Sequence, residues 1–246
     1  GLSGDVQHGG VPDGWRIGDK HSLMLGTHNS TFEIHSFRIT PLDMRFAAKD
    51  AVVGKMIDIL PQIDLLRDAV GGEFQYARDS IGMWGNAPRL QLPYAPPREY
   101  QLEVELTHHR HPCEVTLNLP VDGKPCTVVI NRFARPEPFS QISIGQGGEQ
   151  QPRQRKGDIL QVNARQTIRC VVRRDLIQIS RGNDEIFRIE GRRTVVDAEP
   201  DHIPPEPSAL SLGSRSVRNG AAMLIHSIKF TPLSGGTRSL PRSRMK

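Results

Sequence analysis

The sequence predicts an all-β protein, an antiparallel β-sandwich with one short helical connector. Three features of its 246 residues predict this fold. Several segments alternate apolar and polar residues, which is typical of strands with one buried face. Turn residues separate these segments at intervals of about ten residues, as in sandwiches and barrels. Only one stretch has helical spacing. The longest apolar run has five residues (221–225), so we expect no membrane span, which needs about 18.

An internal repeat marks the start of the chain. Residues 22–27 (SLMLGT) match 209–214 (ALSLGS), and 32–42 (FEIHSFRITPL) match 223–233 (MLIHSIKFTPL), with nine of the 17 aligned positions identical. Self-similarity of this kind indicates a repeat architecture. We expect residues 1–45 to be the remnant of a preceding repeat that forms a pair of strands. A structural duplication within one sandwich is the alternative.

The helical spacing lies in residues 46–71. Apolar residues recur there every three to four positions. Pro61 interrupts the pattern because proline lacks the N–H that a helix interior needs, and Gly71 and Gly72 form a plausible C-terminal stop. We therefore expect a connector made of two short helices or one kinked helix.

Residues 72–235 are predicted to form the sandwich domain. The expected strands are 100–106, 115–119, 127–133, 166–173, 176–180 and 185–190, followed by the second copy of the repeat. Alternation allows only one face of a strand to be buried. The residues expected inside are Leu102, Val104, Leu106, Val115, Leu117, Ile168, Cys170, Ile177, Ile179, Ile228 and Phe230.

Charge and cysteine spacing argue against two kinds of site. The net charge is +5, and most of it lies in residues 236–246, which we expect to be a flexible basic tail. Because the remaining fold is nearly neutral, we expect no nucleic-acid partner, which would need a basic stripe on the fold. Cys113, Cys126 and Cys170 fit neither a zinc site nor a disulfide framework. Free buried thiols are expected, with a Cys113–Cys126 bridge as the alternative.

Three segments resemble a known family. They are RLQLPYAPPREYQLEVEL at 89–106, TIRCVVRRDLIQISRGNDEIFRIEG at 167–191 and ALSLGSRSVRNGAAMLIHSIKFTPL at 209–233. Together they resemble the concanavalin A-like lectin/glucanase jelly roll, including the 3-keto-disaccharide hydrolase-like and laminin G-like modules of large bacterial proteins. The resemblance implies a carbohydrate ligand, other domains of the same chain as partners, and a place in the cell envelope or outside the cytoplasm. The family includes lectins, adhesion modules and glycosidases, so the fold does not decide the function.

Candidate catalytic residues lie close together in the sequence. Glu103 and Glu105 share one strand face with Cα atoms about 6.6 Å apart, and glycosidases use paired carboxylates. The jelly-roll glucanases that this chain resembles carry a further acid where His108 stands here. The alternative is a solvated polar face of a strand.

Candidate ligand-binding residues include three aromatic side chains. Sugar sites commonly stack aromatic rings on a pyranose, and Trp84, Tyr94 and Tyr100 lie beside glycines or a proline-rich turn. Core packing is the alternative for these rings.

Histidines supply the last candidates. His109 could bind a ligand, and with His111 it shares a strand face, but no third ligand can be placed and we expect no metal. A polar hairpin end is the alternative. His35 and His226 recur in both repeat copies, which favours a structural role.

These features favour a non-catalytic carbohydrate-binding or assembly module of a larger bacterial protein, without a cofactor. The alternative is a glycoside-cleaving enzyme of the 3-keto-disaccharide hydrolase type that uses carboxylates on a sheet face.

Overall fold

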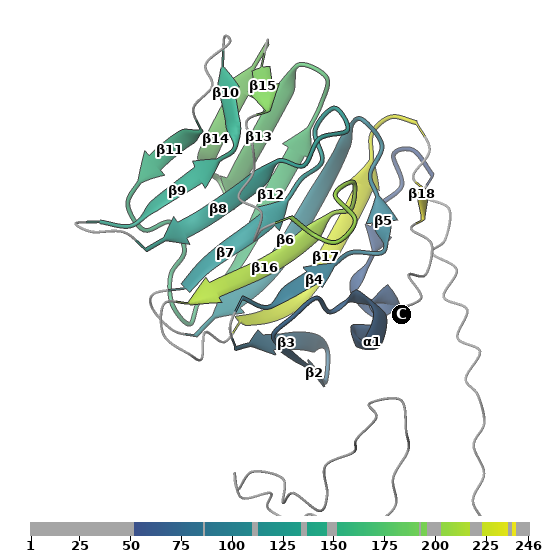
Figure 1. Ribbon diagram of the computed structural model, residues 1–246, viewed down its shortest axis with the longest axis vertical. Coiled ribbons are helices and arrows are strands. Elements are labelled where there is room, and N and C mark those ends of the chain that lie inside the picture. Colours follow the sequence, from purple (N-terminus) through teal and green to yellow (C-terminus); the bar gives the residue numbers. More distant parts are fainter. Residues whose placement is uncertain are drawn as a thin grey trace, which may run out of the picture. The chain divides into compact units, whose positions relative to one another are not determined.

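Two antiparallel sheets pack face to face, as Figure 1 shows. The computed structural model describes residues 52–85, 87–109, 113–133, 137–146, 152–191, 193–195, 203–216, 223–235 and 238–239. The all-β sandwich predicted from the sequence is confirmed in this part of the chain.

The larger sheet, which we name sheet A, contains eight of the described strands. Its order is β14 (Asp184–Glu190), β13 (Leu176–Arg181), β12 (Arg165–Val172), β6 (Tyr100–His108), β17 (Met223–Pro232), β3 (Ser80–Trp84) and β2 (Glu73–Ala77), and β1 (Ile57–Asp58) also pairs with β17.

The facing sheet, sheet B, contains six of the described strands. Its order is β11 (Arg153–Lys156), β9 (Phe139–Ile142), β8 (Thr127–Arg132), β7 (Cys113–Asn118), β16 (Ser211–Ser216) and β4 (Arg89–Gln91). Two small ladders join β10 (Ile144–Gln146) to β15 (Arg193–Val195), and β18 (Arg238–Ser239) to β5 (Tyr94–Ala95).

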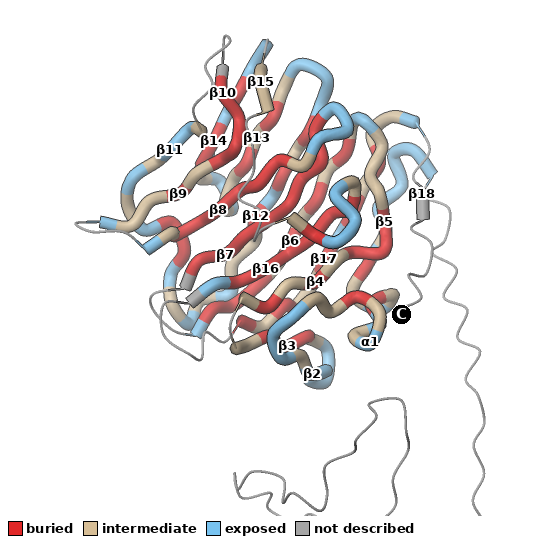
Figure 2. Tube along the Cα trace, in the orientation of Figure 1, coloured by how far each residue is buried: buried red, intermediate tan, exposed pale blue. Residues whose placement is uncertain are grey.

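The core lies between the sheets and follows the two-residue period. All eleven residues expected inside are fully buried, and Figure 2 shows buried positions running along the strands. Val104 of β6 pairs with Ile168 on one side and Ile228 on the other, so the buried positions of three neighbouring strands are aligned. Cys126 and Cys170 are free, buried thiols, which excludes a bridge from Cys126.

The described part of the expected connector contains two single turns of helix. A 3-10 turn, η2 (Leu60–Gln62), contains Pro61, and α1 (Leu65–Asp68) follows after Ile63. The Asp64 side chain caps α1 by accepting a hydrogen bond from the Leu66 amide at 3.0 Å. No helix in the described ranges has the length and apolar character of a transmembrane span.

The second copy of the repeat crosses from one sheet to the other. Its first strand, β16, lies in sheet B between β7 and β4, whereas β17 lies in sheet A between β6 and β3. The first copy, within the expected remnant 1–45, lies outside the described residues. In the segment 236–246, expected to be a flexible tail, Arg238–Ser239 forms β18 and pairs with β5.

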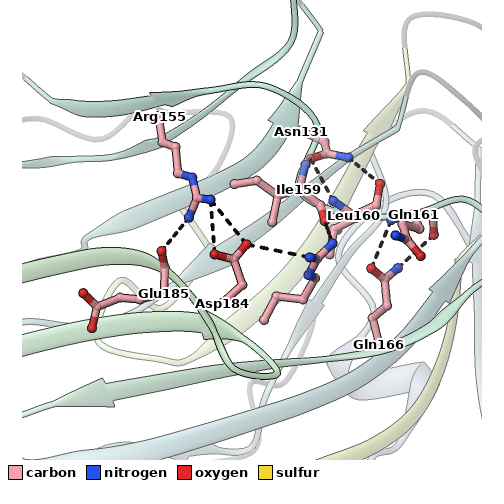
Figure 3. Close-up of polar contacts among 9 residues, drawn as sticks. Asn131, Arg155, Ile159, Leu160, Gln161, Gln166, Asp184 and Glu185 are labelled. Carbon is pink, nitrogen blue, oxygen red and sulfur yellow. Dashed lines mark hydrogen bonds and ion pairs between the residues drawn. The ribbon is translucent and has the colours of Figure 1, made fainter.

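Arginine side chains link the edges of the two sheets where β11 faces β14 (Figure 3). Arg155 of β11 donates to the Asp184 carboxylate at 3.2 Å and to the Glu185 carbonyl. Arg181 donates to the Ile159 carbonyl, and Asn131 accepts a hydrogen bond from the Ile159 amide at 2.7 Å. The Arg155 contacts with Asp184 and Glu185 thus join an edge strand of sheet B to an edge strand of sheet A.

Candidate functional site

A mixed apolar and polar surface lies on the outer face of sheet A. Because Leu106 faces the core, the alternate positions Glu103, Glu105 and Thr107 of β6 point to the outer face, where the glutamates are half-buried and Thr107 is buried. Strand pairing aligns Gly82 of β3 with Leu224 of β17, and Leu224 with Thr107.

The indole of Trp84 lies along this face over Gly82. A Cβ on Gly82 would be only 2.9 Å from Cζ3 of the indole, so the ring occupies the space that a side chain at this position would fill. Nε1 of Trp84 donates to the Glu73 carboxylate at 2.5 Å. The hydrogen bond to Glu73 and the contact over Gly82 restrain this half-buried ring.

Polar groups of β12, β6 and β17 lie on the same face of sheet A, and Leu224 separates Thr107 from Gly82. Arg165 of β12 donates to Glu105 at 2.6 Å, and this hydrogen bond lowers the pKa of Glu105 below its usual value. Thr107 Oγ1 and His226 Nε2 are hydrogen-bonded at 2.9 Å. Burial, and then the charge of Arg165, lower the pKa of His226, so its imidazole is neutral at pH 7. His109 Nδ1 and Asn163 Oδ1 are hydrogen-bonded at 3.0 Å.

The outward glutamates expected to be catalytic are both ion-paired. Glu103 lies 3.3 Å from the Arg169 guanidinium, in addition to the Glu105–Arg165 pair. His108, grouped with these glutamates in the sequence, is fully buried on the opposite face of β6. The three residues therefore do not meet in one site.

Two of the aromatic candidates are core residues. The Tyr94 hydroxyl donates to Gln62 at 2.7 Å and the Tyr100 hydroxyl donates to the Pro120 carbonyl at 3.0 Å. Both rings are buried and contact Phe230, with centroids 5.9 and 6.0 Å away. A sugar cannot reach them from outside, so Trp84 and His109 are the ligand-binding candidates that lie at the surface.

The sequence reasoning missed several members of this surface. Arg165, Thr107 and Gly82 were not singled out, and His226 was assigned a structural role. Alternation within β6 could have identified Thr107, but the position of His226 depends on a bulge between Ile225 and Ser227. His111 lies outside the described residues. Within the described ranges, no group of three or more histidine, cysteine or acidic side chains is placed to hold a metal ion.

No family profile and no curated protein matches the sequence. Among solved structures, the chain is similar to the carbohydrate-binding module CBM66 from Bacillus subtilis (10% identity, TM-score 0.43, 72% of this chain and 95% of that chain). It is also similar to a legume lectin-like domain from Entamoeba histolytica (11%, 0.45, 72% and 97%) and a β-1,3-glucanase from Mycobacterium marinum (12%, 0.42, 62% and 74%). These structures are thus described as a carbohydrate-binding module, a lectin-like domain and a glucanase. At these identities and TM-scores, the likeness assigns no function to this chain.

Proposed function

We propose that the outer face of sheet A around Trp84 binds a carbohydrate without cleaving it. The observation that carries this proposal is the partly exposed indole of Trp84, whose Cζ3 edge lies over Gly82. The face of a pyranose ring is lined with C–H groups, and its edge carries hydroxyls. A fixed aromatic ring bordered by hydrogen-bonding groups suits such a ligand.

The polar groups on the same face as the indole supply hydrogen bonds to the hydroxyls of the sugar. Gly82 and Thr107 are separated by one intervening strand, which corresponds to about 10 Å across the sheet. The Leu224 side chain lies between these two positions, so a sugar bound here would lie across it and reach the polar groups with its hydroxyls. The neutral imidazole of His226 can donate or accept a hydrogen bond.

Glycoside cleavage fits this surface less well. A general acid must hold its proton at the working pH, which for a carboxyl group requires a raised pKa. The hydrogen bond from Arg165 lowers the pKa of Glu105, and Glu103 is paired with Arg169. These pairs support binding over catalysis.

A glycan array with two matched variants tests the proposal. Trp84→Ala removes the platform, and Phe133→Ala removes an aromatic ring that is 48% exposed outside this surface. We expect the wild type and Phe133→Ala to bind the same glycans, and Trp84→Ala to bind them at least about tenfold more weakly, which corresponds to about 1.4 kcal/mol. Unchanged binding by Trp84→Ala would contradict the placement of the site. Hydrolysis of a glycoside panel by the purified wild-type protein would contradict the absence of catalysis.

A further inference from the structure

A pocket lies at the start of β6, away from Trp84. It is a pocket of about 430 Å³ whose walls include Pro96, Pro97 and Pro120. Arg98 and Asp122 supply charged groups to the same lining. Arg98 precedes β6, whereas His109 follows it, so the pocket and the Trp84 surface lie near opposite ends of a strand about 30 Å long.

The Asp122 carboxylate is hydrogen-bonded to Arg98. Asp122 occupies a tight turn, in which its own φ is +49° and that of Gly123 is +77°. Its carboxylate accepts a hydrogen bond from Nε of Arg98 at 3.2 Å. Among the described residues, Asp122 is the one hydrogen-bond partner of the Arg98 guanidinium. Both terminal nitrogens of Arg98 are therefore available to a ligand. The side chain is 59% exposed, so these nitrogens can be reached. A guanidinium offered in this way matches a carboxylate or sulfate bidentately.

A buried cation lies behind the same carboxylate. The Arg193 side chain is only 5% exposed, and its Nη2 lies 3.5 Å from Asp122 and donates to the Arg173 carbonyl at 2.8 Å. Its Nε and Nη1 are buried without a hydrogen-bond partner. One carboxylate thus faces two guanidinium groups, and the buried one is poorly compensated.

The other acids near the pocket are engaged elsewhere. The Glu206 carboxylate accepts hydrogen bonds from the amide and hydroxyl of Ser208, another lining residue. The Glu99 carboxylate accepts a hydrogen bond from the Arg174 amide at 2.8 Å. The charge that faces a ligand is therefore that of Arg98, reinforced by the field of Arg193.

We propose that this pocket binds a pyranose-sized molecule that carries a carboxylate or sulfate. The proline rings contact the apolar part of the ligand, and the terminal nitrogens of Arg98 bind its anionic group. Asp122 acts as a positioning residue for Arg98. The site is independent of the carbohydrate surface proposed around Trp84.

Titration of the ¹⁵N-labelled protein with glucuronate, and with glucose as the uncharged control, tests this proposal by NMR. We expect glucuronate, at up to about 20 mM, to shift the signals of Gly123, Ser208 and the Arg98 side chain, whereas glucose does not. Inorganic sulfate should compete with glucuronate.

Variants separate this site from other sources of binding. Arg98→Gln should abolish the shifts. Arg98→Lys should weaken binding by about fivefold or more, because lysine keeps the charge but cannot donate two parallel hydrogen bonds to the anionic group. Arg153→Gln, which removes an exposed arginine of β11, and Trp84→Ala should both bind as the wild type does. Equal shifts with glucose, no shifts with glucuronate, or unchanged binding by Arg98→Gln would each overturn the proposal. Since Trp84→Ala alone tests the other surface, failure of one proposal is distinguishable from failure of the other.

Discussion

Replacing Gly82 with alanine should dislodge Trp84 from the outer face of sheet A. The added Cβ would lie 2.9 Å from Cζ3 of the indole and 3.5 Å from Cδ2 of Leu224. Carbon atoms in contact are normally about 3.5 to 4.0 Å apart, so the indole must move by about 0.6 to 1.1 Å while Leu224 can stay in place. Overpacking of this kind costs about 1 to 3 kcal/mol.

The same substitution in a variant that lacks the indole measures the free-energy cost of this steric overlap directly. In a Trp84→Ala background the added methyl group meets no ring, and alanine stabilises a strand by about 0.5 to 1 kcal/mol relative to glycine. Gly82→Ala should therefore destabilise the otherwise wild-type protein by up to about 2.5 kcal/mol and stabilise the Trp84→Ala variant by about 0.5 to 1 kcal/mol. The difference between the two effects, about 1 to 3 kcal/mol, is the coupling between the two positions.

Urea denaturation of the four proteins, followed by circular dichroism, provides the assay. At an m-value of about 2 kcal/mol/M, a destabilisation of about 1 kcal/mol lowers the midpoint by about 0.5 M urea. If Gly82→Ala has the same effect in both backgrounds, the indole of Trp84 does not lie over Gly82, and the proposed platform is wrong.

Charge, packing and thiol burial each predict a further measurable behaviour. Because the hydrogen bond from Arg165 lowers the pKa of Glu105, this pair stabilises the fold above the usual pKa of 4.5 and loses that contribution as the pH falls through the lower folded pKa. The difference in unfolding free energy between wild type and Glu105→Gln should thus shrink on acidification below 4.5 in urea denaturation, and a growing difference would contradict the pairing. Phe230→Ala should cost about 3 to 5 kcal/mol in the same assay because the ring is fully buried, and a loss below about 1 kcal/mol would be inconsistent with a core position. Burial raises the pKa of Cys126 to about 12 and also raises the pKa of Cys170. Neither thiol should therefore react with iodoacetamide at pH 8 until urea unfolds the protein. Labelling of either thiol in the native protein would refute their burial.

The strands and the core could be predicted because alternation is a local property of the chain. Tyr100 has the same parity as Leu102 and Val104, so the period alone assigns it to the core, in agreement with its burial. The prediction that Tyr100 binds a ligand rests on its aromatic side chain and disregards this period. In the same way, Glu103 and His108 have opposite parity on β6, which separates two residues that the family resemblance had grouped.

The polar half of the candidate site depends on contacts that no local pattern encodes. Glu105 and Arg165 are 60 residues apart and meet because β6 pairs with β12. His226 reaches Thr107 because a bulge between Ile225 and Ser227 changes the direction of the side chains along β17. Such a bulge has no sequence signature here, so the surface position of His226 could be found only from the structure.

The position of β16 and β17 has a consequence for how the protein is made. These two strands, near the end of the described sandwich, lie inside both sheets, and Ile225 pairs with Ile81, which is synthesised far earlier. During translation at about 5 to 20 residues per second, the emerging chain therefore exposes two half-built sheets with open inner edges. Both gaps close only when residues up to Pro232 have emerged. A chain that ends before β17 lacks a central strand of sheet A and therefore has no complete core.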